Sequence, residues 1–160
     1  FNNSAEYDMK RFIDATGKQW EIDVHLESIE RVKSSRGIDL TKLFADEMRL
    51  INQLSEDHAT LAEVLWELQT SPGADRSELL RGLRGDALEA GFKALLDDVI
   101  DFFPNSRQRK ICRETVEKLW QTVDAIHDQT EKKLAELSPM LLASATSSAE
   151  SQASHHTGSD

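Results

Sequence analysis

The chain has 160 residues, of which 39% are hydrophobic and 30% charged, and its 19 basic and 29 acidic residues give a net charge of -10. That length is typical of one domain whose core can form without disulfides or metals. The negative charge argues against nucleic acid and anionic membrane as partners of the whole surface. It fits a protein that remains dissolved, or one that binds a basic or aggregation-prone protein.

The cysteine count and the hydropathy pattern bound the compartment. Cys112 is the only cysteine, so no internal disulfide can form, and its apolar helical position predicts a buried, unreactive thiol. No run approaches the roughly 18 apolar residues of a membrane span, and the N-terminal residues lack the pattern of a signal peptide. We therefore expect a cytoplasmic protein. Met9 is a candidate start, which makes residues 1–8 a flexible extension.

Two strand-like runs open the chain. In residues 20–26 apolar residues alternate with polar ones, as on a half-buried strand. The residues that this alternation places on one face are Trp20, Ile22, Val24 and Leu26. Residues 10–14 precede them, and the short link containing Gly17 predicts a β-hairpin. Because an isolated hairpin is only marginally stable, helices must cover its apolar face.

Helical periodicity follows the hairpin. We expect a short helix over residues 27–35 that ends at Gly37. Asp39 and Ser55 are the predicted N-caps of the next two helices. The run Thr70-Ser71-Pro72-Gly73 then breaks the pattern.

A long helix is predicted from a capping box at Asp75 and Glu78 toward residue 103, with a break at Gly85 as the alternative. Pro104 ends it. Asn105 or Ser106 caps the last helix, whose apolar residues recur at steps of four and three. This seam consists of Cys112, Val116, Leu119, Val123, Ile126, Thr130, Leu134 and Leu137.

The sequence therefore predicts an α+β fold, predominantly helical, in which an N-terminal β-hairpin is followed by four or five helices. The last two helices should form a C-terminal αα-hairpin, because only a short link joins them. One domain is expected over residues 9–138. Residues 139–160 are rich in Ser, Ala and Thr and are expected to be a disordered tail.

No pattern indicates a catalytic, cofactor or metal site. The histidines at 25, 58 and 127 lie on different elements without a second ligand at metal spacing. Asp97 and Asp101 share a helix face, but we expect them to be solvated and neutralised by the basic residues between Arg107 and Arg113. That basic cluster lacks interleaved aromatics, so we expect no nucleic acid as a partner.

Two tryptophans leave two interpretations open. Trp66 lies one position away from the apolar stripe that includes Leu65, and Trp120 one position away from Leu119. Each fits either the edge of the core or an exposed patch that binds a protein. On the second interpretation the candidate partner-binding residues are Trp66, Trp120, Leu119, Val123 and Ile126.

The chain also resembles a family. The features that carry the resemblance are Met9–Asp14, Gly17, Trp20, Ile22, Val24, Gly37–Leu40, Gly85–Ala90 and Asp101–Pro104. Over roughly residues 9–137 the chain resembles the tail assembly chaperones encoded among the tail genes of bacteriophages and prophages. The resemblance implies a non-enzymatic protein that keeps the helical tape measure protein soluble and helps to recruit tail tube subunits.

Three functions follow as hypotheses. The first is an assembly chaperone or adaptor that binds a helical client protein. The alternative is a self-assembling structural protein that forms homo-oligomers through the seam from Cys112 to Leu137. The third is an enzyme whose carboxylate site contains Asp97 and Asp101.

Overall fold

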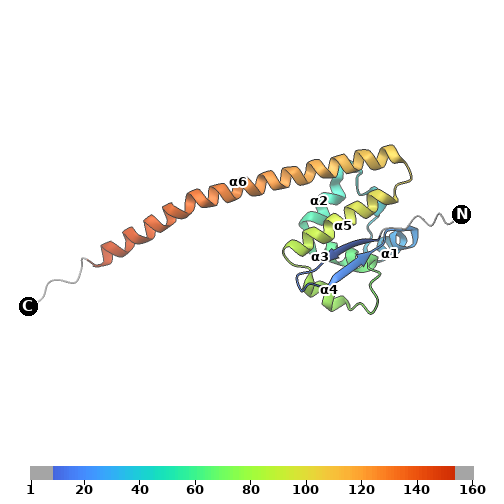
Figure 1. Cartoon of the computed structure of the whole chain (residues 1–160), viewed down its shortest axis with the longest axis horizontal. Helices are drawn as coiled ribbons and strands as arrows, with labels where there is room; N and C mark the ends of the chain where they lie inside the picture. Colours follow the sequence, from blue (N-terminus) through green and yellow to red (C-terminus); the bar gives the residue numbers. More distant parts are fainter. Residues whose placement is uncertain (1–8, 154–160) are drawn as a thin grey trace, which may run out of the picture. The chain divides into compact units, whose positions relative to one another are not determined.

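The computed structural model describes the backbone of residues 9–153 and the side chains of residues 9–141 (Figure 1). Residues 1–8, where an extension was predicted, and residues 154–160 lie outside the description. The elements in chain order are β1 (Lys10–Ile13), β2 (Gln19–Ile22), α1 (Leu26–Arg36), the 3-10 turns η1 (Leu40–Lys42) and η2 (Asp46–Met48), α2 (Arg49–Glu56), α3 (His58–Leu68), α4 (Arg76–Gly82), α5 (Asp86–Phe102) and α6 (Ser106–Ala153). This confirms the α+β, predominantly helical class, with six α-helices in the described part instead of four or five.

The chain divides into two compact units, one up to Glu114 and one from Thr115 onward. The single domain over residues 9–138 stays a prediction, and each unit is described by itself. In the second unit, the seam residues Ile126, Leu134 and Leu137 are more than half exposed.

Residues 139–160 were predicted to be a disordered tail, and the structure differs over residues 139–153, where α6 passes through Pro139 and continues to Ala153. A proline inside a helix removes one backbone hydrogen bond and costs about 3 kcal/mol. Extending a helix that has already formed is much easier than starting one, and the segment after the proline is rich in alanine, the best helix former.

The two strands form an antiparallel hairpin in which Phe12 lies opposite Trp20. Both side chains are buried, as is Ile22. The second strand is shorter than predicted, and Leu26 is 71% exposed, so its assignment to the apolar face was wrong. The cause is a local cap: the Ser28 hydroxyl accepts a hydrogen bond from the backbone amide of His25 and so starts α1 at residue 26.

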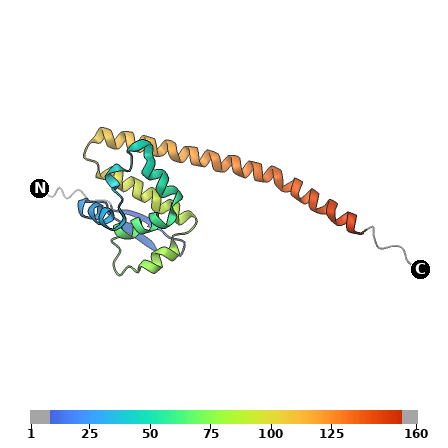
Figure 2. The same ribbon diagram turned by 180° about the vertical axis from the view of Figure 1, so that it is seen from behind.

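Helices and one extended segment cover the hairpin. The chain after α3 continues the sheet, because Gln69 forms a β-bridge with Ile22 and Thr70 donates its backbone N–H to the Glu21 carbonyl. Helix α5 packs along β1, and α1 packs against α3 (Figures 1 and 2). The fully buried side chains of the first unit include Trp20, Leu40, Leu43, Leu54, Leu61, Leu65, Leu68, Leu79, Leu95 and Leu96.

The residues at which the helices begin contradict two predictions and confirm a third. Asp39 caps only the short turn η1, and Ser55 lies inside α2. Asp57 caps α3 instead, through a hydrogen bond from the backbone N–H of Thr60. The alternative of a break at Gly85 is confirmed, since this glycine has a φ of 58° and separates α4 from α5.

A buried carboxylate fixes the hairpin turn. Asp14 is 5% exposed, and its Oδ1 accepts hydrogen bonds from Thr16 N (2.8 Å), Thr16 Oγ1 (2.6 Å) and Lys18 N (3.0 Å). Its Oδ2 accepts from the indole Nε1 of Trp20 at 2.9 Å. Gly82, at the end of α4, lies against the same carboxylate, and its carbonyl accepts the Ala15 N–H.

We predict that Gly82→Ala destabilises the protein by about 3 kcal/mol. A Cβ at residue 82 would overlap Oδ2 of Asp14 and lie 2.6 Å from its Cγ, so the carboxylate must leave Trp20 or α4 must shift. Helix propensity alone predicts the opposite sign, because alanine favours helix over glycine by about 1 kcal/mol. Urea unfolding followed by circular dichroism measures the change. Arg81→Ala, at an exposed position of the same helix, is the control and should change stability little.

Candidate partner-binding surface

Helix α6 begins with a side-chain cap and a reversal of the chain. Asn105 Oδ1 accepts hydrogen bonds from the backbone N–H groups of Arg107 (2.9 Å) and Gln108 (3.2 Å). Arg113 then returns to α5, where its Nη2 lies 2.6 Å from Oδ1 of Asp101. The end of α5 and the first turns of α6 therefore form the start of an αα-hairpin.

Apolar side chains of α6 form a straight stripe. At about 100° per residue, seven positions fall within an arc of about 80° around the helix. We call these residues the α6 stripe: Leu119, Val123, Ile126, Thr130, Leu134, Leu137 and Leu141. The steps are four and three, with two successive steps of four around Thr130, and this keeps the stripe parallel to the axis of an ordinary α-helix.

The C-terminal part of the α6 stripe, from Ile126 to Leu141, is exposed. The exposed fractions are 55% for Ile126, 59% for Leu134, 51% for Leu137 and 68% for Leu141. Among residues 9–141, six of the nine exposed large hydrophobic side chains belong to α6, so apolar exposure is concentrated on this helix. An exposed apolar surface of this kind marks an interaction site in soluble proteins.

The five predicted partner-binding residues are divided between the units. Leu119, Val123 and Ile126 belong to the α6 stripe, and Trp120 lies at its side, about 80° from the centre by the helical repeat. Leu119, Trp120 and Val123 are part-exposed. Trp66 is part-exposed on α3 in the other unit. The surface therefore rests on α6 alone.

Sequence reasoning missed the last part of this surface. Met140 and Leu141 are 71% and 68% exposed, yet they were assigned to the tail because Pro139 precedes them. The signal that could have found them is the spacing, since Leu141 follows Leu137 by the same step of four.

The three carboxylates at the end of α5 differ in their contacts. Asp98 points into the core, where its Oδ2 accepts the backbone N–H of Val24 at 2.7 Å. Asp101 is held by ion pairs with Lys10 (2.9 Å) and Arg113 (2.6 Å), and the latter confirms the predicted neutralisation by the basic cluster. Asp97 is exposed. Two of the three carboxylates are therefore already committed to contacts within the fold.

Two further properties of the described part bear on ligands and membranes. Within it, no three His, Cys, Asp or Glu side chains gather in a way that could hold a metal ion. None of its helices is long and apolar enough to cross a membrane. Cys112 is buried, as predicted, and burial raises the pKa of its thiol.

Comparison with protein-family models, with curated proteins and with solved structures finds no match for this chain.

Asp98 makes the stability of the fold dependent on pH. It is 4% exposed, and burial raises its pKa from 3.8 to about 6, against the lowering effect of the hydrogen bond from Val24. Below pH 3.8 the carboxyl is protonated in both the folded and the unfolded chain, so it carries no penalty. As the pH rises, the Asp98 carboxyl ionises first in the unfolded chain. The free energy of unfolding therefore falls, by about 3 kcal/mol in total relative to acid conditions.

We predict that Asp98→Asn removes this dependence. The amide oxygen can still accept the Val24 N–H, and it carries no buried charge. The difference in free energy of unfolding between the variant and wild type should therefore shift by about 3 kcal/mol in favour of the variant as the pH rises from about 4 to about 7. Urea denaturation across this range measures the difference. Asp97→Asn, one residue away and exposed, is the control, and an equal gain in that variant would contradict the explanation.

Proposed function

We propose that this protein is a non-enzymatic adaptor or assembly chaperone that holds a helical segment of a client protein on the α6 stripe. The observation that carries the proposal is the exposure of the stripe from Ile126 to Leu141. The resemblance to phage tail assembly chaperones suggests the specific form: a cytoplasmic chaperone whose client is a tape measure or tail tube protein.

The physical basis is burial of apolar surface between two helices. From Leu119 to Leu141 the stripe extends for about 33 Å, which matches about six turns of a partner helix. A client helix with apolar residues at steps of three and four would cover it along its whole length. Each exposed Leu or Ile that becomes fully buried contributes about 1.5–3 kcal/mol before the cost of association is subtracted.

The charge of the chain supports a chaperone role. A net charge of -10 keeps molecules with an exposed apolar stripe apart and opposes their aggregation. The stripe itself contains no charged residue, since its one polar member is Thr130. Contact with a client is therefore apolar where the helices meet, and repulsion acts through the remaining surface.

The second candidate is a self-assembling structural protein, favoured by the steps of four and three that extend from Cys112 to Leu141. Such a repeat can pair with the same helix of another copy. The two candidates differ in what covers the stripe when the protein is alone. A structural component forms an oligomer of fixed mass by itself, and a chaperone does so only with its client.

We predict that Leu134→Gln combined with Leu137→Gln abolishes client capture and leaves the first unit folded. The matched control is Ala125→Gln combined with Ala135→Gln, which adds the same side chains on the opposite side of α6. A photo-crosslinking amino acid replaces residue 134, alone or together with Leu137→Gln, or replaces residue 135 on the opposite side. Each protein is expressed in the native host, and the crosslinked proteins are identified by mass spectrometry. Sedimentation velocity gives the mass of the purified protein.

The chaperone proposal expects crosslinks from residue 134 to one long, helix-rich protein or to a tail tube subunit, and none from residue 135. Loss of these crosslinks when Leu137→Gln is combined with the crosslinker at residue 134, with thermal unfolding as in wild type, supports the stripe as the contact. Crosslinks only between copies of this chain, together with a fixed oligomer in sedimentation, would overturn the proposal in favour of self-assembly.

A further inference from the structure

A cleft of about 520 Å³ opens between the end of α1, the turn η1 and the start of α2. Four basic side chains line it: Lys33, Arg36, Lys42 and Arg49. They come from three separate elements of the first unit, which brings cations together in a chain whose net charge is -10. Ile38 and Leu50 add apolar surface.

The basic side chains differ in their partners. Lys33 lies 3.6 Å from Asp39, and Arg36 lies 2.7 Å from Glu63, so both are paired within the fold. Lys42 influences Asp39 electrostatically, and it makes no ion pair within 4.0 Å among residues 9–141. Arg49 likewise makes no ion pair within 4.0 Å among residues 9–141. Lys42 and Arg49 are therefore the two cations available to a ligand.

The backbone beside the cleft is unusual. Asp46, Glu47 and Met48 have φ angles of 51°, 56° and 60°, so three consecutive residues other than glycine are left-handed. Each costs about 1–2 kcal/mol relative to ordinary backbone. The last of them directly precedes Arg49, the first residue of α2, and so fixes where this helix starts. Strained segments of this kind cluster at binding sites.

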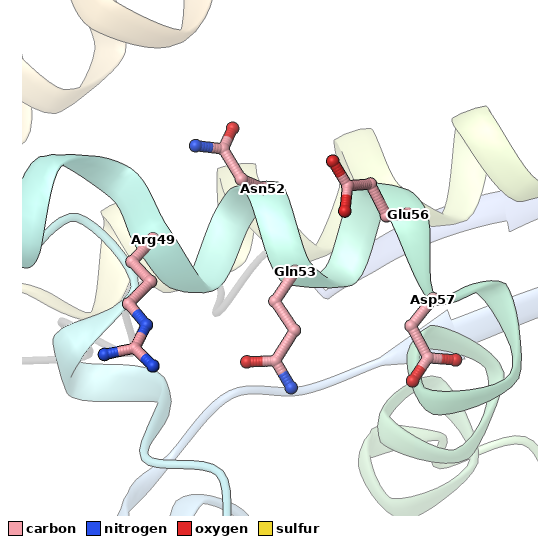
Figure 3. A pocket seen from close by; sticks show the side chains of 5 residues that line it. All are labelled: Arg49, Asn52, Gln53, Glu56 and Asp57. Carbon is pink, nitrogen blue, oxygen red and sulfur yellow. The ribbon is translucent and has the colours of Figure 1, made fainter.

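The exposed side of α2 continues the cleft. Arg49 and Gln53 line it and also border a second hollow with Asn52, Glu56 and Asp57. Figure 3 shows Arg49, Gln53 and Asp57 extending from one side of the helix, with Asn52 and Glu56 on the other. A ligand that pairs with Arg49 can therefore also reach the amide of Gln53, one helical turn away.

We propose that this cleft binds an acidic linear segment of a protein, with carboxylates of the segment paired to Lys42 and Arg49. The volume lies within the range of pockets that hold drug-sized ligands and exceeds what a single phosphate fills. Asp39 and Asp46 also line the cleft, so a densely charged polyanion meets repulsion there. A peptide can place carboxylates beside the two cations and neutral or apolar residues beside Asp39, Asp46 and Leu50.

Fluorescence anisotropy at low ionic strength tests the proposal with labelled peptides that carry two glutamates at graded spacing. The same peptides with glutamine in place of glutamate are the neutral probes. At one or more spacings the full-length protein should bind the acidic peptide, and Lys42→Gln combined with Arg49→Gln should weaken this binding about tenfold. Arg81→Gln combined with Arg84→Gln removes the same charge from exposed positions elsewhere in the unit and should leave it unchanged.

Three results would overturn the proposal: no spacing binds, the neutral peptides bind as well as the acidic ones, or the control variant weakens binding as much as the cleft variant. Tighter binding of a single-stranded oligonucleotide, lost in the cleft variant, would overturn the choice of ligand. The α6 stripe takes no part in these measurements, so their outcome is independent of the client proposal. Thermal unfolding of each variant ensures that lost binding reflects the cleft and not the fold.

Discussion

The hydrogen bond from Trp20 to the carboxylate of Asp14 is the contact on which the first unit depends. Trp20 is completely buried, and its indole N–H would be an unsatisfied donor without this acceptor. The same carboxylate holds the hairpin turn through Thr16 and Lys18 and rests against Gly82 of α4. Burial alone would raise the pKa of Asp14, but its hydrogen bonds together lower it, so the charge is stabilised inside the fold.

The hairpin is held by a second buried aspartate on α5, and the two differ in how well they are satisfied. Asp14 receives four hydrogen bonds at the turn, whereas the hydrogen bond shown for Asp98 is the one from Val24 just beyond β2. The nearby charge of Asp23 adds to the effect of burial at Asp98. The two carboxylates therefore respond to pH in opposite directions: Asp14 stabilises the fold when ionised, and Asp98 when protonated.

Local sequence patterns predicted the structural features that depend on residues close together in the chain. Alternation around Trp20 and a flexible Gly17 were enough for the hairpin, and Gly85 marked the break between α4 and α5. The residue at which a helix begins was harder to predict, since Ser55 and Asp57 both suit an N-cap and the structure has the cap at Asp57. The cleft was missed because its cations come from three elements and because, of residues 46–48, only Asp46 is of a type that favours left-handed backbone.

The candidate surface on α6 was predicted in part. A regular apolar repeat predicts that one face of a helix packs against another element, but it does not identify that element. In the first unit such faces meet other elements of the chain, as α5 meets β1. On α6 the residues from Ile126 to Leu141 keep the same repeat, yet remain more than half exposed at each Leu and Ile. A core partner would have buried them, and a helix that only needs solvent would carry polar residues at these positions. A repeat that is apolar and exposed is a surface that a partner helix can cover, and the proposal that α6 binds a client rests on this physical argument.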